Sequence, residues 1–279
     1  MKSLDTLVED IYDLVDEGLE CTDEELSEFG KGVAEALANS LGRRENKKTL
    51  RMSNIGTPCN RKLWYTVKGV EAERLPPPAR LKFAFGHILE ELLLFLAKKS
   101  GHSVEGRQDT QEIEGIQGHR DAVIDGVVVD VKSASTYSFK KFEEGKLKED
   151  DPFGYSDQIQ SYLHAGQDDP LVTDKSRAAF LVIDKTLGNV CLDIHKKDRF
   201  PIDSLYRYKK EIVAKDDPPA RKYEPIPDGK SGNMKLGMEC SYCDFKKTCY
   251  PGLRTFLYSN KPVFLTEVKK EPNVPESRS

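Results

Sequence analysis

The stretch from Gly118 to Ser135, GHRDAVIDGVVVDVKSAS, constrains the fold of this chain more than any other part of its sequence. It contains Asp125 followed by Gly126 between runs of β-branched residues. A two-residue hairpin turn of type I′ needs positive φ at both central positions, and Asp-Gly is well suited to it. The stretch therefore predicts a β-hairpin in which Asp121 stands directly across from Asp130.

The predicted hairpin has one polar and one apolar face. Because side chains two apart share a face of a strand, Lys132 lies on the same side as Asp130 and Asp121. Opposed carboxylates repel each other, and a divalent cation such as Mg²⁺ or Mn²⁺ relieves the repulsion. The alternative is that these are ordinary exposed strand residues, with Lys132 merely neutralising Asp130. The apolar face would carry Ala122, Ile124, Val127, Val129 and Val131.

An Asp, a spacer through a turn, then Asp, one residue and Lys resembles the pattern of the PD-(D/E)XK nuclease superfamily. The resemblance implies a restriction-endonuclease-like α/β core, with a central mixed sheet flanked by helices. It also implies that Asp121 and Asp130 hold the Mg²⁺ or Mn²⁺, joined by the backbone carbonyl of Val131. Lys132 would orient or deprotonate the attacking water, and a pKa lowered by the nearby metal would suit that role.

The segment 81–99 predicts a largely buried helix with acidic residues inside an apolar run. Many RecB-like nucleases carry a GxxxH element in this place. Here the residue four positions after Gly86 is Glu90 instead of a histidine. Some phage-type relatives have a glutamate there. We therefore expect Glu90 to be a further metal ligand, with His87 as the fallback. The alternative is a helix whose acids simply reach solvent.

A second helix is predicted around 156–166, where Gln158 and Tyr162 are spaced i and i+4. They match the QxxxY element of RecB-type nucleases, which contacts DNA or the catalytic lysine. On its own the match is weak, because Tyr162 could equally be a core residue.

The chain has six cysteines, and three of them form a CxxC followed by another cysteine. Three clustered cysteines call for a fourth metal ligand, and Cys59 is the best candidate. One cysteine before the nuclease core and three after it resembles the iron–sulfur subgroup of RecB-like nucleases, which includes the AddB subunit and CRISPR-adaptation nucleases. The resemblance spans about 51–250 and implies a [4Fe–4S] cluster, with Zn²⁺ as the alternative. The ligands would be Cys59, Cys240, Cys243 and Cys249.

Three parts of the chain are predicted. Residues 1–48 form a helical extension of two helices, the second of which starts with a capping box from Thr22 to Glu25. Residues 49–258 form the nuclease domain with its four-cysteine site. Residues 259–279 mix charge and proline with few apolar residues, which predicts a flexible tail.

The net charge of −4 gives no overall attraction to a polyanion, so a nucleic-acid partner has to be argued locally. Basic clusters near 43–51, 61–62 and 207–222 are more often solvated faces than phosphate contacts. Aromatic side chains offer stacking surfaces for unpaired bases, which bind strands without reading their sequence. The candidates are Trp64, Tyr65, Tyr137 and Phe139.

The expected function is that of a metal-dependent exonuclease, which hydrolyses DNA phosphodiester bonds from ends without sequence specificity, in recombination, repair or end processing. Its partners would be DNA with a free end or single-stranded region, and a recombination protein. The alternatives are a structure-selective or restriction-type endonuclease, and a zinc-stabilised nucleic-acid-binding module without catalysis. No apolar run is long enough for a membrane span and no signal segment is visible, so we expect a cytoplasmic protein.

Overall fold

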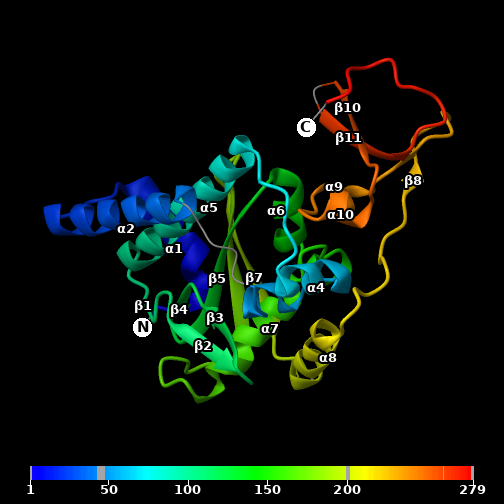
Figure 1. The fold of residues 1–279 in the computed structure, drawn as a ribbon. Coiled ribbons are helices and arrows are strands. Elements are labelled where there is room, and N and C mark those ends of the chain that lie inside the picture. Colours follow the sequence, from blue (N-terminus) through cyan, green and yellow to red (C-terminus); the bar gives the residue numbers. More distant parts are fainter. Residues whose placement is uncertain (1, 43–47, 199–201, 260, 278–279) are drawn as a thin grey trace. The chain divides into compact units, whose positions relative to one another are not determined.

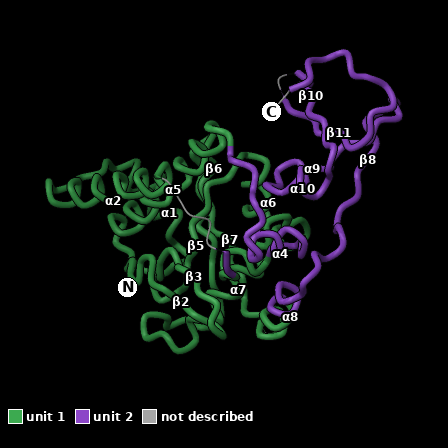
Figure 2. The backbone as a smooth tube through the Cα atoms, viewed as in Figure 1, with its two compact units in different colours: residues 1–46, 50–56, 76–208 green, residues 47–49, 57–75, 209–279 purple. Residues whose placement is uncertain are grey.

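The structure is a computed structural model that describes residues 2–42, 48–198, 202–259 and 261–277. It divides into two compact units, coloured separately in Figure 2. Unit 1 comprises residues 1–46, 50–56 and 76–208, and unit 2 comprises residues 47–49, 57–75 and 209–279. Residues 43–47, which belong to the first basic cluster, lie outside the described residues. No described helix has the length and apolarity to cross a membrane.

Unit 1 has an α/β fold with a central mixed sheet flanked by helices, as the sequence predicts (Figure 1). The five strands run in the order β1-β4-β5-β6-β7. Strands β5 and β6 are parallel, and every other neighbouring pair in this sheet is antiparallel. The strands are β1 (Val104–Glu105), β4 (Ala122–Ile124), β5 (Val127–Ala134), β6 (Arg177–Asp184) and β7 (Val190–Lys196).

The predicted hairpin is present as β4 and β5, with its register confirmed from Ala122↔Val129 to Ile124↔Val127. Asp125 and Gly126 have φ of 49° and 79°, the positive values that the turn requires. The paired ladder begins at Ala122, so Asp121 lies just outside it and is not a ladder partner of Asp130.

Each face of the sheet packs against helices, and the two faces have separate cores (Figure 1). Helices α1 (Leu7–Glu17) and α5 (Pro77–Lys99) cover the face made by the five apolar hairpin residues that the sequence assigns to it. The other face packs against α3 (Met52–Ile55), α6 (Thr136–Glu143) and α7 (Tyr155–Ala165), together with the hairpin of β2 (Thr110–Ile113) and β3 (Ile116–His119). Both hairpin faces are therefore buried, and only polar residues near the strand ends remain accessible.

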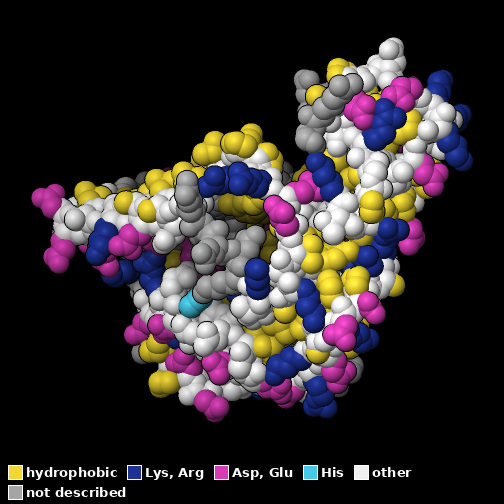
Figure 3. Space-filling model, in the orientation of Figure 1, with side chains coloured by type: hydrophobic (Ala, Val, Ile, Leu, Met, Phe, Trp, Pro, Cys, Tyr) yellow, Lys and Arg dark blue, Asp and Glu magenta, His cyan; other side chains and the backbone are white. Residues whose placement is uncertain are grey.

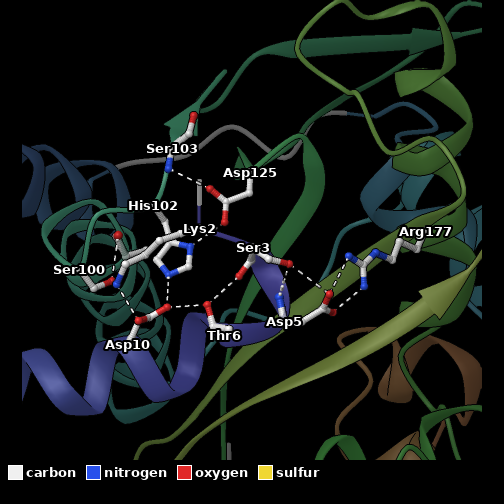
Figure 4. Close-up of polar contacts among 11 residues, drawn as sticks. Lys2, Ser3, Asp5, Thr6, Asp10, Ser100, His102, Ser103, Asp125 and Arg177 are labelled. Atoms are coloured by element: carbon white, nitrogen blue, oxygen red, sulfur yellow. Dashed lines mark hydrogen bonds and ion pairs between the residues drawn. The ribbon is translucent and has the colours of Figure 1, made fainter.

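The hairpin turn is fastened to α1 through a buried imidazole (Figure 4). The side chain of His102 has no exposed surface; its Nδ1 lies 2.6 Å from Asp125 Oδ2 and its Nε2 lies 3.1 Å from Asp10 Oδ2. Asp125 also accepts the backbone N–H of Ser103 at 3.0 Å. These contacts connect the N-terminal helix to the turn that precedes β5.

Helix α2 (Asp23–Leu41) begins with the predicted capping box, in which Thr22 and Glu25 bond each other's backbone N–H groups. It packs along α5, where the rings of Phe29 and Phe95 stack at 4.7 Å. Lys99 of α5 bonds the same Glu25 at 2.9 Å. Both helices predicted for the N-terminal region are thus present.

The predicted partition at 48 and 258 differs from the structure. Residues 1–46 belong to unit 1, because Leu4, Leu7 and Ile11 are buried in the core on one face of the sheet. Residues 57–75 and 209–258 belong instead to unit 2. The predicted flexible tail is wrong for 261–267, which form a strand. Leu265 is buried there, within a short apolar run that lies between charged residues in the sequence.

Unit 2 contains a small antiparallel sheet in the order β10-β11-β9-β8. A separate small core, made by Trp64, Tyr65 and Phe245, lies beside the cysteine-bearing segments. The strands of unit 2 are β8 (Ile226–Pro227), β9 (Met234–Lys235), β10 (Arg254–Tyr258) and β11 (Lys261–Glu267). Its helices include α4 (Asn60–Lys68), α9 (Met238–Ser241) and α10 (Lys246–Cys249). Helix α8 (Ile202–Ala214) crosses from unit 1 into unit 2, and the short 3₁₀ helices are η1 (Leu4–Thr6), η2 (Leu147–Glu149) and η3 (Gly166–Asp168).

Candidate active site

Asp130 and Lys132 lie on one face of β5 and form an ion pair. Asp130 is 3% exposed, so its charge is almost fully withdrawn from water. The Nζ atom of Lys132 lies 5.0 Å from the ring centre of Tyr155 and 5.7 Å from that of Phe180. The amine is therefore held between a buried carboxylate and two aromatic rings, which restricts the positions that the ammonium group can occupy.

Asp121 reaches the same region from the start of β4 by a different route from the predicted cross-strand pairing. Its Oδ2 accepts the backbone N–H of Val131 at 2.7 Å. The side-chain amide of Gln108 donates to Asp121 Oδ1 at 3.4 Å and to Glu90 Oε1 at 2.8 Å. One amide group thus connects the two carboxylates. Nothing in the sequence around Gln108 marks it, because its partners are 18 and 13 residues away.

Burial and mutual repulsion disfavour the charged carboxylates. The pKa of Asp121 is raised well above its usual value by burial first, then by the charges of Asp130 and Glu90. The pKa of Asp130 is also raised by burial, although Lys132 opposes the shift. A positive charge placed among these groups would reverse both effects. The gathered negative charges are therefore costly, and Lys132 is the positive group that offsets part of this cost.

The pKa of Lys132 is raised in this structure. Burial alone would lower that pKa, but the charges of Asp130 and Asp121 outweigh it. The expected lowering depends on a nearby metal ion, so it stays a prediction for the metal-bound site.

Helix α5 brings Glu90 to the site, and a glycine one turn earlier permits the close approach. A Cβ on Gly86 would lie 3.3 Å from Ser133 Oγ of β5, tighter than ordinary contact. Glu90 has a 14% exposed side chain, whereas the His87 side chain is 43% exposed. His87 Nδ1 lies 3.5 Å from Glu90 Oε2. The geometry therefore places Glu90, rather than His87, next to Asp121 through Gln108.

Gln158 and Tyr162 are both buried on α7, and their side chains hydrogen-bond each other. The pKa of Tyr162 is raised by burial first, then by the charge of Asp130, while the bond from Gln158 opposes the shift. The electrostatic influence of Asp130 places the phenol near this one acidic residue of β5. The QxxxY pair thus lies beside the candidate site, as a core-facing pair.

A cavity of about 510 Å³ opens beside Asp121 and Glu90. One wall is formed by α2, a helix in which the sequence shows no chemical motif. The volume is in the range of sites for small ligands, about 300–1,000 Å³. The N-terminal region therefore contributes to the site as well as to the core. Residues of α2 in the wall are Glu28, Lys31, Gly32, Glu35, Ala36 and Asn39.

Among the described residues, no group of three or more His, Cys, Asp or Glu side chains is arranged to hold a metal ion. At the hairpin, each of the three carboxylates has a partner within the chain. Asp130 pairs with Lys132, Asp121 accepts an N–H group, and Glu90 accepts the Gln108 amide. The set of carboxylate oxygens nevertheless has the donor chemistry that Mg²⁺ and Mn²⁺ prefer.

The four cysteines predicted as cluster ligands all belong to unit 2. Cys59 precedes α4, while the other three lie in and around α9 and α10. The two segments pack together: the rings of Tyr65 and Phe245 are 5.4 Å apart, and Glu73 N donates to Asp244 O at 2.8 Å. Burial, followed by the charges of the other three cysteines, raises the pKa of Cys240 to about 12. Segments that are distant in sequence thus bring the four thiols into electrostatic range.

The aromatic residues proposed for stacking on bases fare differently. Trp64, Tyr65 and Phe139 are buried in cores and present no free ring face, so that expectation is wrong for them. Tyr137 is 71% exposed and keeps its ring accessible. Lys and Arg side chains are interspersed with Asp and Glu side chains over the face drawn in Figure 3, in keeping with the small net charge.

No family model matches this sequence, and no curated protein matches it. Among solved structures, the chain is similar to that of SSO0001, with 15% identity, 79% of this chain and 95% of that chain covered, and a TM-score of 0.43. It is also similar to a phage-related exonuclease from Haemophilus somnus 129PT, with 16% identity, 75% and 88% covered, and a TM-score of 0.32.

Proposed function

We propose that this chain is a metal-dependent deoxyribonuclease of the PD-(D/E)XK type, which hydrolyses phosphodiester bonds from DNA ends without sequence specificity. One observation carries the proposal: Asp121, Asp130 and Lys132 meet at one end of a buried hairpin, with Glu90 joined to Asp121 through Gln108. Carboxylates buried together at an energetic cost, beside an amine and a cavity, are more typical of a reactive site than of a structural one.

In this proposal Asp121, Asp130 and Glu90 hold Mg²⁺ or Mn²⁺, with the carbonyl of Val131 as a further ligand. Such a cation, when bound, makes water more acidic and neutralises charge on the phosphate. Lys132, beside Asp130, orients or deprotonates the attacking water. Gln108, which now bonds both Asp121 and Glu90, would have to give up these bonds for the two carboxylates to hold a cation.

The surrounding residues are suited to a strand that enters by its end. We place the terminus of the strand in the cavity of about 510 Å³ beside Asp121 and Glu90. Gln158 and Tyr162 support the Asp130 side of the site from α7. We therefore propose DNA with a free end or a single-stranded region as substrate, in recombination, repair or end processing, with a recombination protein as partner.

The direct test uses linear and covalently closed circular DNA of the same sequence, with Mg²⁺ or Mn²⁺. We expect linear DNA to be shortened progressively while the circle survives, and a chelator to stop the reaction. Discrete fragments from the circle, produced as fast as linear DNA disappears, would favour a structure-selective or restriction-type endonuclease. DNA binding without degradation in any metal would favour the zinc-stabilised binding module.

Substitutions test the residues. Lys132→Ala and Asp130→Ala each remove a group that acts on the reacting phosphate or its cation, so we expect cleavage to fall by about 100-fold or more. Lys140→Ala, an exposed lysine on α6, is the matched control and should cleave normally. Circular dichroism establishes that each variant is folded. A folded Lys132 variant that cleaves at the wild-type rate would refute the assignment.

We also propose that Cys59, Cys240, Cys243 and Cys249 bind a [4Fe–4S] cluster in unit 2. Their packing and mutual electrostatic influence support this. Protein purified without oxygen should be brown and contain about four iron atoms per chain. A colourless protein with one zinc ion would favour the zinc alternative, and a protein with neither metal would count against any metal site. Cys21, on unit 1, supplies the control variant Cys21→Ser, which should keep the metal.

A further inference from the structure

An exposed aromatic ring extends the candidate site toward solvent. Phe153 lies between η2 and α7 and is 60% exposed. Its ring stacks on that of Tyr155, with centres 5.4 Å apart and an angle of 29°. Tyr155 is the ring over which the Lys132 ammonium lies. A continuous row therefore runs from Lys132 through Tyr155 to the free face of Phe153.

The backbone around Phe153 is firmly held. Asp151 Oδ1 accepts the N–H groups of Gly154 and Tyr155 at 2.8 and 2.9 Å, and its Oδ2 accepts that of Ser156 at 2.8 Å. Gly154 has φ of 75°, and a Cβ there would collide with the carbonyl oxygen of Gly56. The loop is thus fixed by three hydrogen bonds and by the close approach of two backbone segments.

Two acidic residues that precede this ring in the sequence are already paired. Asp151 is occupied by the backbone amides, and Asp150 forms an ion pair with Lys141. A strand reaching Phe153 therefore meets few unpaired acids in this loop. A single exposed apolar side chain is ordinary on a protein surface. Phe153 differs because its backbone is fixed and its ring continues a row that ends at Lys132.

We propose that Phe153 is a positioning residue on which an unpaired DNA base stacks, next to the phosphate held near Lys132. The inference rests on the nuclease function proposed above and narrows its substrate to an unpaired strand. Base faces inside a duplex are covered by their neighbours, so only an unpaired or terminal base presents a free face. Stacking tolerates any base, which agrees with cleavage that ignores sequence.

Binding can be measured apart from hydrolysis. In Ca²⁺ or EDTA, a single-stranded oligonucleotide with 2-aminopurine at successive positions reports stacking by loss of fluorescence, and anisotropy reports affinity. We expect Phe153→Ala to weaken single-strand binding by about tenfold and to abolish the quenching at one position. Phe153→Trp should retain both properties, because it keeps an aromatic face. Phe153→Leu should resemble the alanine variant, because it keeps apolar volume without a ring.

A covalently closed circular duplex, which has no terminal base, is the second substrate and should bind the wild type and Phe153→Ala with equal affinity. With Mg²⁺ or Mn²⁺, the variant should show a raised KM for single strands and a nearly unchanged kcat. Normal quenching and affinity in Phe153→Ala, in a protein that still cleaves DNA, would overturn this inference and leave the nuclease function standing. Equal losses for Phe153→Ala on both substrates would also overturn it. Phe153-dependent quenching without cleavage in any metal would support the stacking role and remove the nuclease function.

Discussion

Arg120 is a buried residue that holds in place a loop next to the candidate site. It is 1% exposed and donates to Asp169 at 2.6 Å, to Asp109 at 2.9 Å and to the carbonyl of Gly106 at 3.1 Å. These bonds hold both ends of the short loop that carries Gln108. The guanidinium thus fixes the backbone of the loop whose amide joins Asp121 to Glu90. Its position directly before Asp121 makes it a structural neighbour of the site.

The Arg120 pair gives a prediction about acid stability. Burial favours the neutral form of Asp169, but the N–H of Leu171 and the Arg120 guanidinium outweigh it and lower the pKa below 3.8. A carboxylate with a lowered folded-state pKa stabilises the fold above the unfolded value, and this contribution is lost as pH falls through the folded value. Asp169→Asn should therefore lower the free energy of unfolding by about 1–3 kcal/mol at neutral pH. The difference from wild type should shrink below about pH 4, near the unfolded value.

Urea unfolding between pH 3 and pH 7 measures this difference. Asp168→Asn, at the exposed neighbouring position, is the matched control and should follow the wild type at every pH. A constant deficit for Asp169→Asn across the whole range would show that its charge is not the cause.

Residue patterns predicted the acids of the site but not their partners. Asp121, Asp130 and Lys132 follow from the spacing around one turn, because hairpin register depends on local geometry. Gln108 and the Arg120 partners are brought in by the loop before β2 and by the segment after α7, which no local pattern links to the hairpin. The raised pKa of Lys132 likewise depends on the contact with Asp130 that folding creates.

At the scale of elements, the hairpin turn requires glycine at position 126 for two reasons, namely its positive φ and the lack of space for a Cβ. Gly126 has φ of 79°, and a Cβ there would collide with Thr173 Oγ1. Its carbonyl also accepts the N–H groups of Thr173 and Asp174 at 3.0 and 3.1 Å. The turn that sets the register of β5 is therefore packed against the segment before β6.

These two demands can be separated experimentally. Gly188 also has φ of 79°, but nothing lies within 4 Å of a Cβ built there. Gly188→Ala should lower the free energy of unfolding by about 1–2 kcal/mol from backbone strain alone. Gly126→Ala should cost more, about 3 kcal/mol, because overpacking adds to the strain. Denaturant unfolding compares them. Equal losses would mean that the Thr173 contact yields without cost.

The elements that the sequence left out have weak local patterns. Helix α6 has only eight residues, and its buried positions reduce to Phe139 and Phe142. The same Phe139 was expected to stack on bases, since an isolated aromatic residue gives no sign of which face it presents. Strand β11 has three consecutive apolar residues, 263–265, and only Leu265 among them is buried. The burial of such short elements depends on the segments that pack on them, so the local sequence does not predict it.

At the scale of the whole molecule, the two units differ in how much core they contain. Unit 1 has an apolar core on each face of a five-stranded sheet. Unit 2 is assembled from separate stretches of chain, with a small cluster of Trp64, Tyr65 and Phe245 and further buried apolar side chains such as Phe256 and Leu265. Domains with small apolar cores often depend on a metal or a disulfide. The four candidate cysteine ligands all belong to unit 2.

This difference between the units predicts which of them loses stability when the metal is removed. Metal binding to a site that the unfolded chain lacks contributes its free energy directly to folding, so removing the metal should destabilise unit 2 selectively. Limited proteolysis of Cys243→Ser, followed by mass spectrometry, should show early cuts within 209–279 while fragments from 76–208 persist. Cys21→Ser should be cut like the wild type, because its thiol lies in unit 1 outside the proposed cluster.

Small-core units open in fluctuations smaller than global unfolding, so cuts confined to unit 2 would report local opening. If cuts in Cys243→Ser appeared at equal rates in both units, the cysteines would be supporting the entire fold, and the separate stability assigned to unit 2 would be wrong.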